Sequence, residues 1–139
     1  MNETTPRICV RDVMKTEFGL IEGNATIYEA LLQMKKLRTS LLVVDKRHVD
    51  DEYGLLLVSD IARQVLALDR SPKRVNVYEV MAKPAVYVDP EMDIRYCSRL
   101  FARFDLVRAL VVEEKKILGT ISPNLLVLDG IFLGLELQK

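Results

Sequence analysis

Two short stretches of the sequence place polar side chains directly before an expected helix. In the first, Gly54 opens an apolar run that ends at Ser59 and Asp60. In the second, Gly119 is followed three residues later by Ser122. A carboxylate accepts hydrogen bonds from two hydroxyl donors at once, and a helix N-terminus offers N–H groups to a phosphate. The first stretch is therefore a candidate for holding a ligand.

The same residues also have a purely structural interpretation. Ser59 or Asp60 as a helix N-cap stabilises the helix by about 1 kcal/mol, and an acid in the first turn suits the helix dipole. The two interpretations of Asp60 stay open at this point. Ser122 precedes Pro123, and a cap followed by proline at the first helical position is a common helix start. For Ser122 the capping interpretation is favoured.

Composition narrows the class of protein. Half of the 139 residues are hydrophobic, and 20 basic residues balance 20 acidic ones. A nucleic-acid surface needs concentrated positive charge, so we expect no nucleic-acid partner. The most apolar stretch, residues 124–139, is interrupted by Asp129 and Glu136, so we expect no membrane span. The first residues lack the apolar region of a signal peptide, and we expect a cytoplasmic protein.

Few side chains are suited to catalysis or metal binding. The chain has one histidine, His48, in a polar stretch, and two cysteines, Cys9 and Cys97, outside any CxxC motif. Cys97 lies within an apolar helical pattern and is expected in the core. The P-loop, GxSxG and HExxH motifs do not occur in the sequence. We therefore expect no enzyme, no catalytic residue, no metal site and no required cofactor.

The sequence contains an internal repeat. "VRDVM" at Val10–Met14 returns as "VYEVM" at Val77–Met81. Two further pairs follow in the same order: Leu41–Asp45 with Ala109–Glu113, and Gly54 with Gly119. Several landmarks in one order indicate two copies of the same unit.

Each half of the chain reads as β-α-β-β-α. An extended piece (18–22 or 84–89) precedes a helix whose apolar stripes are Ile27, Ala30, Leu31, Met34, Leu37 and Ile94, Cys97, Phe101, Phe104. Two strands follow, of which Leu55–Val58 is one, joined by turns at 46–53 and 114–118, and a helix closes each half. The boundaries are a first repeat at 8–68, a linker at 69–75, a second repeat at 76–133 and a tail at 134–139. One repeat of about 60 residues has a thin core. We therefore expect an α+β fold with the repeats packed as a pseudo-two-fold pair.

This order of landmarks, with "VRDVM" and "VYEVM" opening the halves, resembles a tandem pair of CBS domains, the Bateman module. The resemblance covers about residues 8–133. It implies a regulatory module that binds AMP, ADP, ATP or S-adenosylmethionine in clefts between the repeats. It also implies dimers that form through the helices.

The nucleotide signature of this family is G-h-x-(S/T)-x-x-D, and each half departs from it at one position. In the first half Asp60 is present, but Leu57 takes the place of the hydroxyl residue. In the second half Ser122 is present, but Leu125 takes the place of the acid. Neither half carries the complete signature.

The resemblance implies two sets of ligand-binding residues. For the first cleft they are Asp60, Ser59, Leu55, Thr39, Lys83, Pro84, Ala85, Val86, Val107 and Arg108. For the second cleft they are Ser122, Asn124, Phe18 and Gly19. Lys83 and Arg108 would meet a phosphate by charge-assisted hydrogen bonds; alternatively, Arg108 pairs with Asp60 and fills the cleft.

Two functions follow as hypotheses. The first is a ligand-sensing regulatory module, in which an adenosine-containing nucleotide changes the relation of the repeats and biases an unidentified protein partner. The alternative is a ligand-independent homodimerisation or scaffold module with degenerate sites. Its basis is the apolar stretch Leu125–Leu137, which is suited to covering a dimer face.

Overall fold

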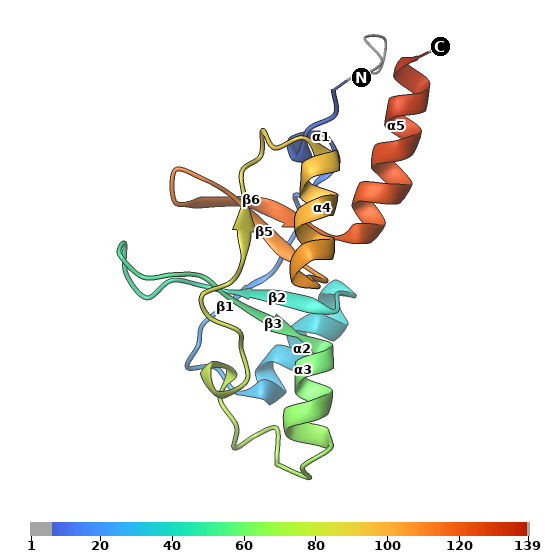
Figure 1. Ribbon diagram of the computed structural model, residues 1–139. Helices are drawn as coiled ribbons and strands as arrows, with labels where there is room; N and C mark the ends of the chain where they lie inside the picture. Colours follow the sequence, from blue (N-terminus) through green and yellow to red (C-terminus); the bar gives the residue numbers. More distant parts are fainter. Residues whose placement is uncertain (1–6, 139) are drawn as a thin grey trace. The chain divides into compact units, whose positions relative to one another are not determined.

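The computed structural model describes residues 7–138 and divides into two compact units (Figure 1). One unit is Phe18–Ala85, and the other joins the residues up to Glu17 with those from Val86 onward. The predicted lack of a signal peptide rests on residues 1–13, of which residues 1–6 lie outside the described residues, as does residue 139 of the predicted tail.

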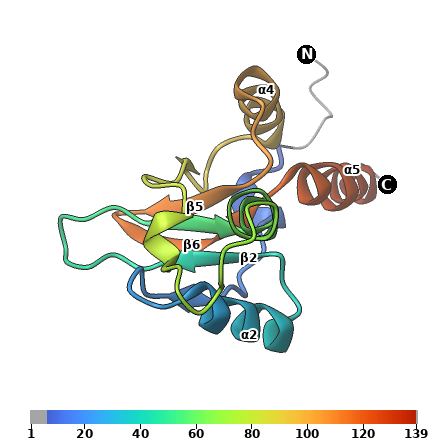
Figure 2. The same cartoon turned by 90° about the horizontal axis from the view of Figure 1, so that it is seen from below.

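The unit Phe18–Ala85 is built on a three-stranded sheet. Strand β1 (Leu20–Ile21) runs parallel to β2 (Leu41–Val44), and β2 pairs antiparallel with β3 (Gly54–Leu57). Helix α2 (Ile27–Leu37) packs beside β2 (Figure 2). Its buried residues join those of the strands in one hydrophobic core, so this half has the predicted β-α-β-β order.

Helix α2 begins where its sequence specifies. The Thr26 hydroxyl accepts a hydrogen bond from the Glu29 amide, and the Glu29 carboxylate accepts one from the Thr26 amide, both at 3.1 Å. This reciprocal capping box satisfies two amides of the first turn. Met34 of the predicted apolar stripe is buried, whereas Leu37 is 48% exposed. The predicted helix is confirmed, but its stripe faces the core over the first turns rather than the last.

The segment after β3 turns helical earlier than expected. Helix α3 spans Val58–Ile61 and continues as the π-helical segment η1 (Ala62–Leu66). The predicted strand Leu55–Val58 therefore ends one residue too late. Because the Val58 amide bonds to the Ser40 carbonyl at 2.9 Å, the pairing of β2 with β3 fixes this boundary.

The other unit repeats the same layout. Strand β4 (Tyr87–Val88) runs parallel to β5 (Ala109–Glu113), and β5 pairs antiparallel with β6 (Lys116–Ile121). Its helical elements are α1 (Val10–Val13), α4 (Ile94–Phe104), η3 (Leu125–Asp129) and α5 (Gly130–Leu137). The predicted α+β class is confirmed. The turn predicted at 114–118 is shorter, because Glu114 and Lys115 alone connect the strands with φ of 50° and 66°, as a two-residue hairpin requires.

Helix α4 directs most of its predicted stripe into the core of its unit. Phe101 is 4% exposed and Cys97 is fully buried, whereas Phe104 at the helix end is 60% exposed. Burial raises the pKa of the Cys97 thiol to about 11. A thiol held in its neutral form is a poor nucleophile, so the prediction that Cys97 is a core residue is confirmed.

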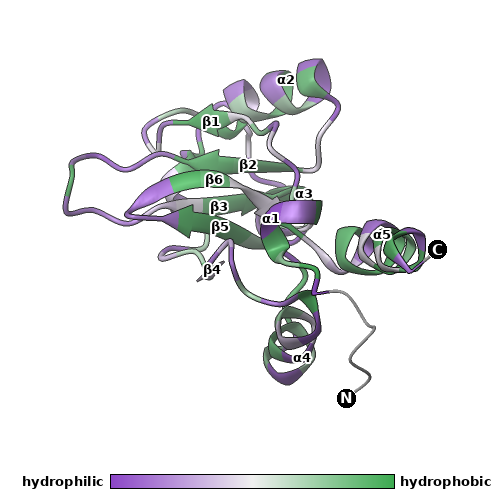
Figure 3. Ribbon diagram, turned by 90° about the horizontal axis from the view of Figure 1, so that it is seen from above, coloured by the Kyte–Doolittle hydropathy of each residue, from purple (hydrophilic) through white to green (hydrophobic). Residues whose placement is uncertain are grey.

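The C-terminal helical segment exposes most of its apolar side chains. Leu126 and Gly130 are buried against the rest of the unit. The exposed set is Val127, Leu128, Ile131, Phe132, Leu135 and Leu137, which we call the η3–α5 face. Hydrophobic residues recur around α5 (Figure 3). Of the helices between residues 7 and 138, none is long and apolar enough to cross a membrane.

Each unit contains the opening segment of one repeat and the sheet of the other. In the first unit, Ala82, which directly follows "VYEVM", exchanges two backbone hydrogen bonds of 2.9 Å with Leu55 of β3. In the second, Lys15, which directly follows "VRDVM", exchanges two of 2.9 Å with Thr120 of β6. The compact units are therefore not the two stretches of sequence that repeat.

The glycine at the matching point of each repeat allows this close approach. A Cβ on Gly119 would collide with the backbone of Lys15. A Cβ on Gly54 would lie 2.9 Å from the Met81 sulfur and 3.3 Å from the Ala82 carbonyl oxygen. The paired glycines are thus explained by packing of the opening segments.

Replacing Gly119 by alanine should destabilise the protein, because the obstructing atoms belong to the backbone. We expect Gly119→Ala to lower the free energy of unfolding by roughly 1–3 kcal/mol. Gly134→Ala is the control, because a Cβ there meets nothing within 4 Å, and alanine in a helix stabilises by about 0.5–1 kcal/mol. Urea denaturation measures both, and equal stabilities would contradict this account.

Candidate functional site

Asp60 lies in the first turn of α3 but does not cap it. The N-cap residue is Leu57, and no side chain makes a cap hydrogen bond there. The capping interpretation of Ser59 and Asp60, one of the two left open by the sequence, is therefore wrong, because the helix begins at Val58. Ser59 is exposed. Asp60 remains a first-turn acid, whose charge is favourable near the helix N-terminus.

The carboxylate of Asp60 forms an ion pair with Arg63 on the following turn. The Asp60 side chain is only 14% exposed, whereas that of Arg63 is 68% exposed. Sequence reasoning missed Arg63, although residues three apart on a helix are neighbours. The pair joins a shielded acid to a guanidinium that solvent, or an anionic ligand, reaches.

Thr39 lies at the same end of the sheet as Asp60. Its hydroxyl donates to the Leu41 carbonyl at 3.1 Å and accepts from the Leu41 amide at 3.3 Å. Thr39 and Val58 line a shallow hollow of about 470 Å³ with Met34 and neighbouring residues. The structure thus brings Thr39 together with Val58, the residue before Ser59, whereas Ser59 and Asp60 do not line this hollow.

The other predicted residues of this unit lie along the earlier part of β3. Leu55 is buried and pairs with Ala82, and the Ala85 amide donates to the Tyr53 carbonyl at 2.9 Å. Pro84 is exposed and follows a cis peptide bond. The ammonium of Lys83, expected at a phosphate, donates to the Asp51 carboxylate at 2.9 Å.

Three predicted first-cleft residues belong to the other unit. Val86 is 45% exposed and Val107 is 56% exposed. The Arg108 guanidinium donates to the Val107 carbonyl at 2.8 Å. Both roles considered for Arg108, with a phosphate or with Asp60, stay predictions.

The second signature is divided in the same way. The Ser122 side chain is buried, and its hydroxyl accepts a hydrogen bond from the Leu125 amide at 3.4 Å. Pro123 is the first helical residue, so the capping interpretation of Ser122 is confirmed. Asn124 is exposed. Phe18 and Gly19 belong to the unit Phe18–Ala85, where Gly19 packs against Leu37 and Leu42.

Metal binding finds no support in the described part of the chain. Between residues 7 and 138, no three His, Cys, Asp or Glu side chains gather closely enough to hold a metal ion. One charge cluster mixes signs: Asp51 accepts hydrogen bonds from Arg47 and Lys83, which hold the pKa of its carboxyl well below the usual range. This cluster was not predicted, since it depends on residues far apart in sequence.

The fold, the repeat and the paired glycines together define the family. The family model for the CBS domain matches the chain twice, at residues 10–67 and 77–126. The chain belongs to the CBS domain family and carries two copies of the domain.

Relatives of known sequence or structure agree with this assignment. The CBS domain-containing protein YhcV of Bacillus subtilis strain 168 is 29% identical over 113 residues, covering 81% of this chain and 79% of YhcV. Two structures of hexameric CBS-CP12 protein from bloom-forming cyanobacteria are 39% and 36% identical, with TM-scores of 0.81 and 0.86. They cover 84% and 91% of this chain, which in turn spans 64% and 73% of theirs. A protein from Pyrococcus horikoshii, 20% identical over 89% of this chain and 92% of its own, has the same fold with a TM-score of 0.79.

The two serines of the signature stretches should respond differently to truncation. Ser122→Ala removes a buried cap and should lower the free energy of unfolding by about 1 kcal/mol. Ser59→Ala is the control and should change it by less than about 0.5 kcal/mol, because Ser59 is exposed. Urea denaturation of both variants measures the free energy of unfolding. An equal loss of stability in Ser59→Ala would contradict this assignment, because it would show that Ser59 also caps its helix.

Proposed function

We propose that this protein is a regulatory module that binds an adenosine-containing nucleotide. Nucleotide binding changes the protein and thereby regulates a protein partner. AMP, ADP, ATP and S-adenosylmethionine are the candidate ligands. The role is regulatory rather than catalytic, and its place is the cytoplasm, where these compounds are abundant. Membership of the CBS domain family and the tandem layout support this proposal.

The observation that carries the proposal is the state of Asp60. Its carboxylate is mostly shielded from solvent, yet it does not cap the helix in whose first turn it lies. Burying a charged group is costly unless the group is paired. Here the pairing comes from Arg63, whose side chain is largely exposed. An acid in this position, freed from capping, is suited to accept both hydroxyls of a ribose.

The neighbouring groups give the ligand further contacts in this proposal. Thr39 lies at the same end of the sheet, and Arg63 supplies a cation for a phosphate. For the module to act as a switch, the nucleotide must bind one arrangement of the protein more tightly than another. Affinity alone shifts no equilibrium.

A thermal-shift panel tests the role of Asp60. A nucleotide at 100 times its dissociation constant should stabilise the protein by about 2.7 kcal/mol, a shift of several degrees in Tm. Asp60→Asn keeps the shape of the side chain but removes the acceptor charge, so the shift should disappear. Asp105→Asn is the control, since Asp105 is exposed and its φ of 52° is one that asparagine tolerates.

The panel compares AMP, ADP, ATP, S-adenosylmethionine and GTP. A Tm shift with an adenosine compound that persists in Asp60→Asn would show that Asp60 does not bind the nucleotide. The absence of a shift with every compound at millimolar concentration would reject nucleotide sensing itself.

A second function, self-association as a scaffold, is favoured by the η3–α5 face. Phe132 is 63% exposed and Leu128 is 59% exposed, on a helical segment where apolar side chains predominate. Contiguous exposed apolar patches commonly mark interaction surfaces. Two similar structures are of hexameric proteins. We propose that a second copy of this chain covers the η3–α5 face.

A charge placed on this face should dissociate the assembly. Phe132→Glu would bury an unpaired carboxylate in the proposed contact, at a cost of several kcal/mol. Sedimentation velocity should show the wild-type protein as a dimer or larger assembly and the variant as a smaller species. Val49→Glu, in the loop between β2 and β3 where Val49 is 73% exposed, should leave the assembly intact. Wild-type protein that sediments as a monomer would contradict this proposal.

A further inference from the structure

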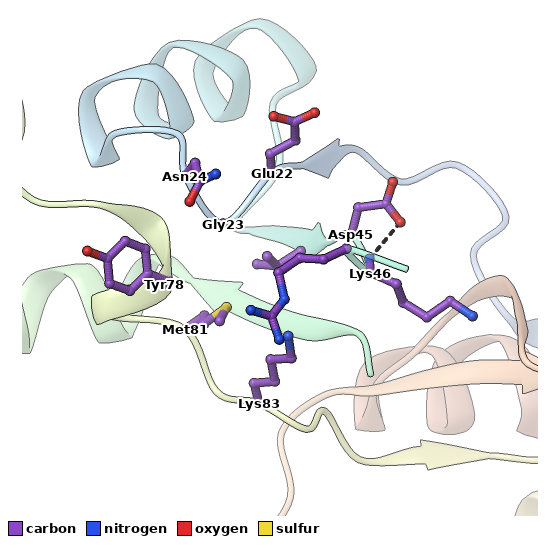
Figure 4. Close-up of a pocket in the computed structure, with 10 residues that line it drawn as sticks. Glu22, Gly23, Asn24, Asp45, Lys46, Tyr78, Met81 and Lys83 are labelled. Atoms are coloured by element: carbon purple, nitrogen blue, oxygen red, sulfur yellow. Dashed lines mark hydrogen bonds between the residues drawn. The ribbon is translucent and has the colours of Figure 1, made fainter. Parts of the chain in front are cut away.

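A second hollow lies within the unit Phe18–Ala85, where β1 and β2 end. It has a volume of about 800 Å³, within the usual range for small-molecule sites. Gly23 and Asn24, which follow β1, form part of its wall, and Met81 and Lys83 form another part (Figure 4). Asp60 does not line it. We call this hollow the β1–β2 pocket.

One carboxylate engages two cations that line the β1–β2 pocket. The Asp51 Oδ2 atom accepts from the Arg47 backbone amide at 2.9 Å, from Arg47 Nε at 3.0 Å and from Lys83 Nζ at 2.9 Å. The Asp51 side chain is 8% exposed, although it comes from the loop between β2 and β3. This triple acceptance is the arrangement that an oxygen of a phosphate or carboxylate ligand would adopt.

Beside the carboxylates of Glu22 and Asp45, which also line the pocket, another part of the lining offers a different chemistry. Tyr78 belongs to the 3₁₀ segment η2 (Val77–Glu79) and is 54% exposed. Met81 lies between Tyr78 and Lys83 in the close-up (Figure 4). An aromatic ring stacks favourably on a tyrosine, and a methionine sulfur also favours aromatic contacts. The pocket therefore joins a cationic part to a part suited to a flat ring.

We propose that the β1–β2 pocket binds a small aromatic phosphate monoester and that Asp51 occupies the position of its phosphate when the ligand is absent. The phosphate replaces the Asp51 carboxylate at Arg47 and Lys83, while the ring packs on Tyr78 and Met81. This site is distinct from the one proposed at Asp60 and does not depend on it.

Displacement of Asp51 would have a structural consequence. The hydrogen bond from Lys83 ties the loop between β2 and β3 to the segment that ends this unit at Ala85. When the ligand takes that bond, the Asp51 side chain is released from the segment, and the hydrogen bond from the Ala85 amide to the Tyr53 carbonyl remains between loop and segment. Binding is thereby converted into a change next to the point where the chain leaves the unit.

Phenyl phosphate is a suitable probe, measured by calorimetry on the full chain. Asp51→Asn removes the competing charge, so it should bind the probe about tenfold more tightly than the wild-type protein, because the binding-competent state is then more populated. Arg47→Ala removes a phosphate donor and should weaken binding about tenfold. The Arg47 side chain is 74% exposed, so this variant should remain folded. Asp60→Asn should leave the affinity unchanged.

Two further measurements separate this proposal from simpler accounts. Inorganic phosphate should bind more weakly than phenyl phosphate to Asp51→Asn, and Tyr78→Ser should remove that difference. Amide exchange of residues 48–53 should rise when the probe binds to the wild-type protein. The proposal is rejected if Asp51→Asn binds the probe no better than the wild-type protein, or if Arg47→Ala leaves its binding unchanged.

Discussion

The structure depends on a backbone pairing between the opening segment of each repeat and the last strand of the other. Each pairing consists of two hydrogen bonds of 2.9 Å, between Ala82 and Leu55 and between Lys15 and Thr120. The chains approach so closely that the strand must carry a glycine beside the pair. This constraint explains why the opening motif and the glycine recur together. It also makes each repeat incomplete by itself, since part of its core is supplied by residues of the other.

Three aspartates illustrate how local surroundings decide what a carboxylate does. Asp93 is 5% exposed and caps α4, accepting from the Arg95 amide at 2.8 Å, so its charge serves the fold. Asp51 forms ion pairs with two cations that line a pocket. Asp60 caps no helix, and its carboxylate pairs with one exposed arginine, Arg63. Asp60 is thus shielded without capping a helix, and it is the carboxylate at which we propose that a ligand binds.

The sequence predicted what local pattern controls, and it failed where distant contacts decide. The stripe from Ile27 to Met34 and the Ser122–Pro123 cap were correct because each depends on neighbours within one helix turn. The capping interpretation of Ser59, one of two that the sequence left open, was wrong because pairing of Leu57 with Leu41 sets the strand end. The pairing of Arg63 with Asp60 could have been predicted, because the two residues are three apart on a helix. The bond from Lys83 to Asp51 could not, because it spans 32 residues. The division into units was hidden for the same reason, since no local pattern records an exchange of segments.

The exchange of opening segments bears on how such a chain arises. A shorter protein with one repeat and this same layout would complete its sheet only with the opening segment of a second molecule. Its own opening segment would pair with the sheet of that second molecule. Such an exchange of the same segment between identical molecules is domain swapping. A gene duplication that joined the two molecules end to end would preserve those contacts. The exchanged segments would then belong to a single chain. The tandem chain is, in this sense, a swapped dimer encoded as a single polypeptide.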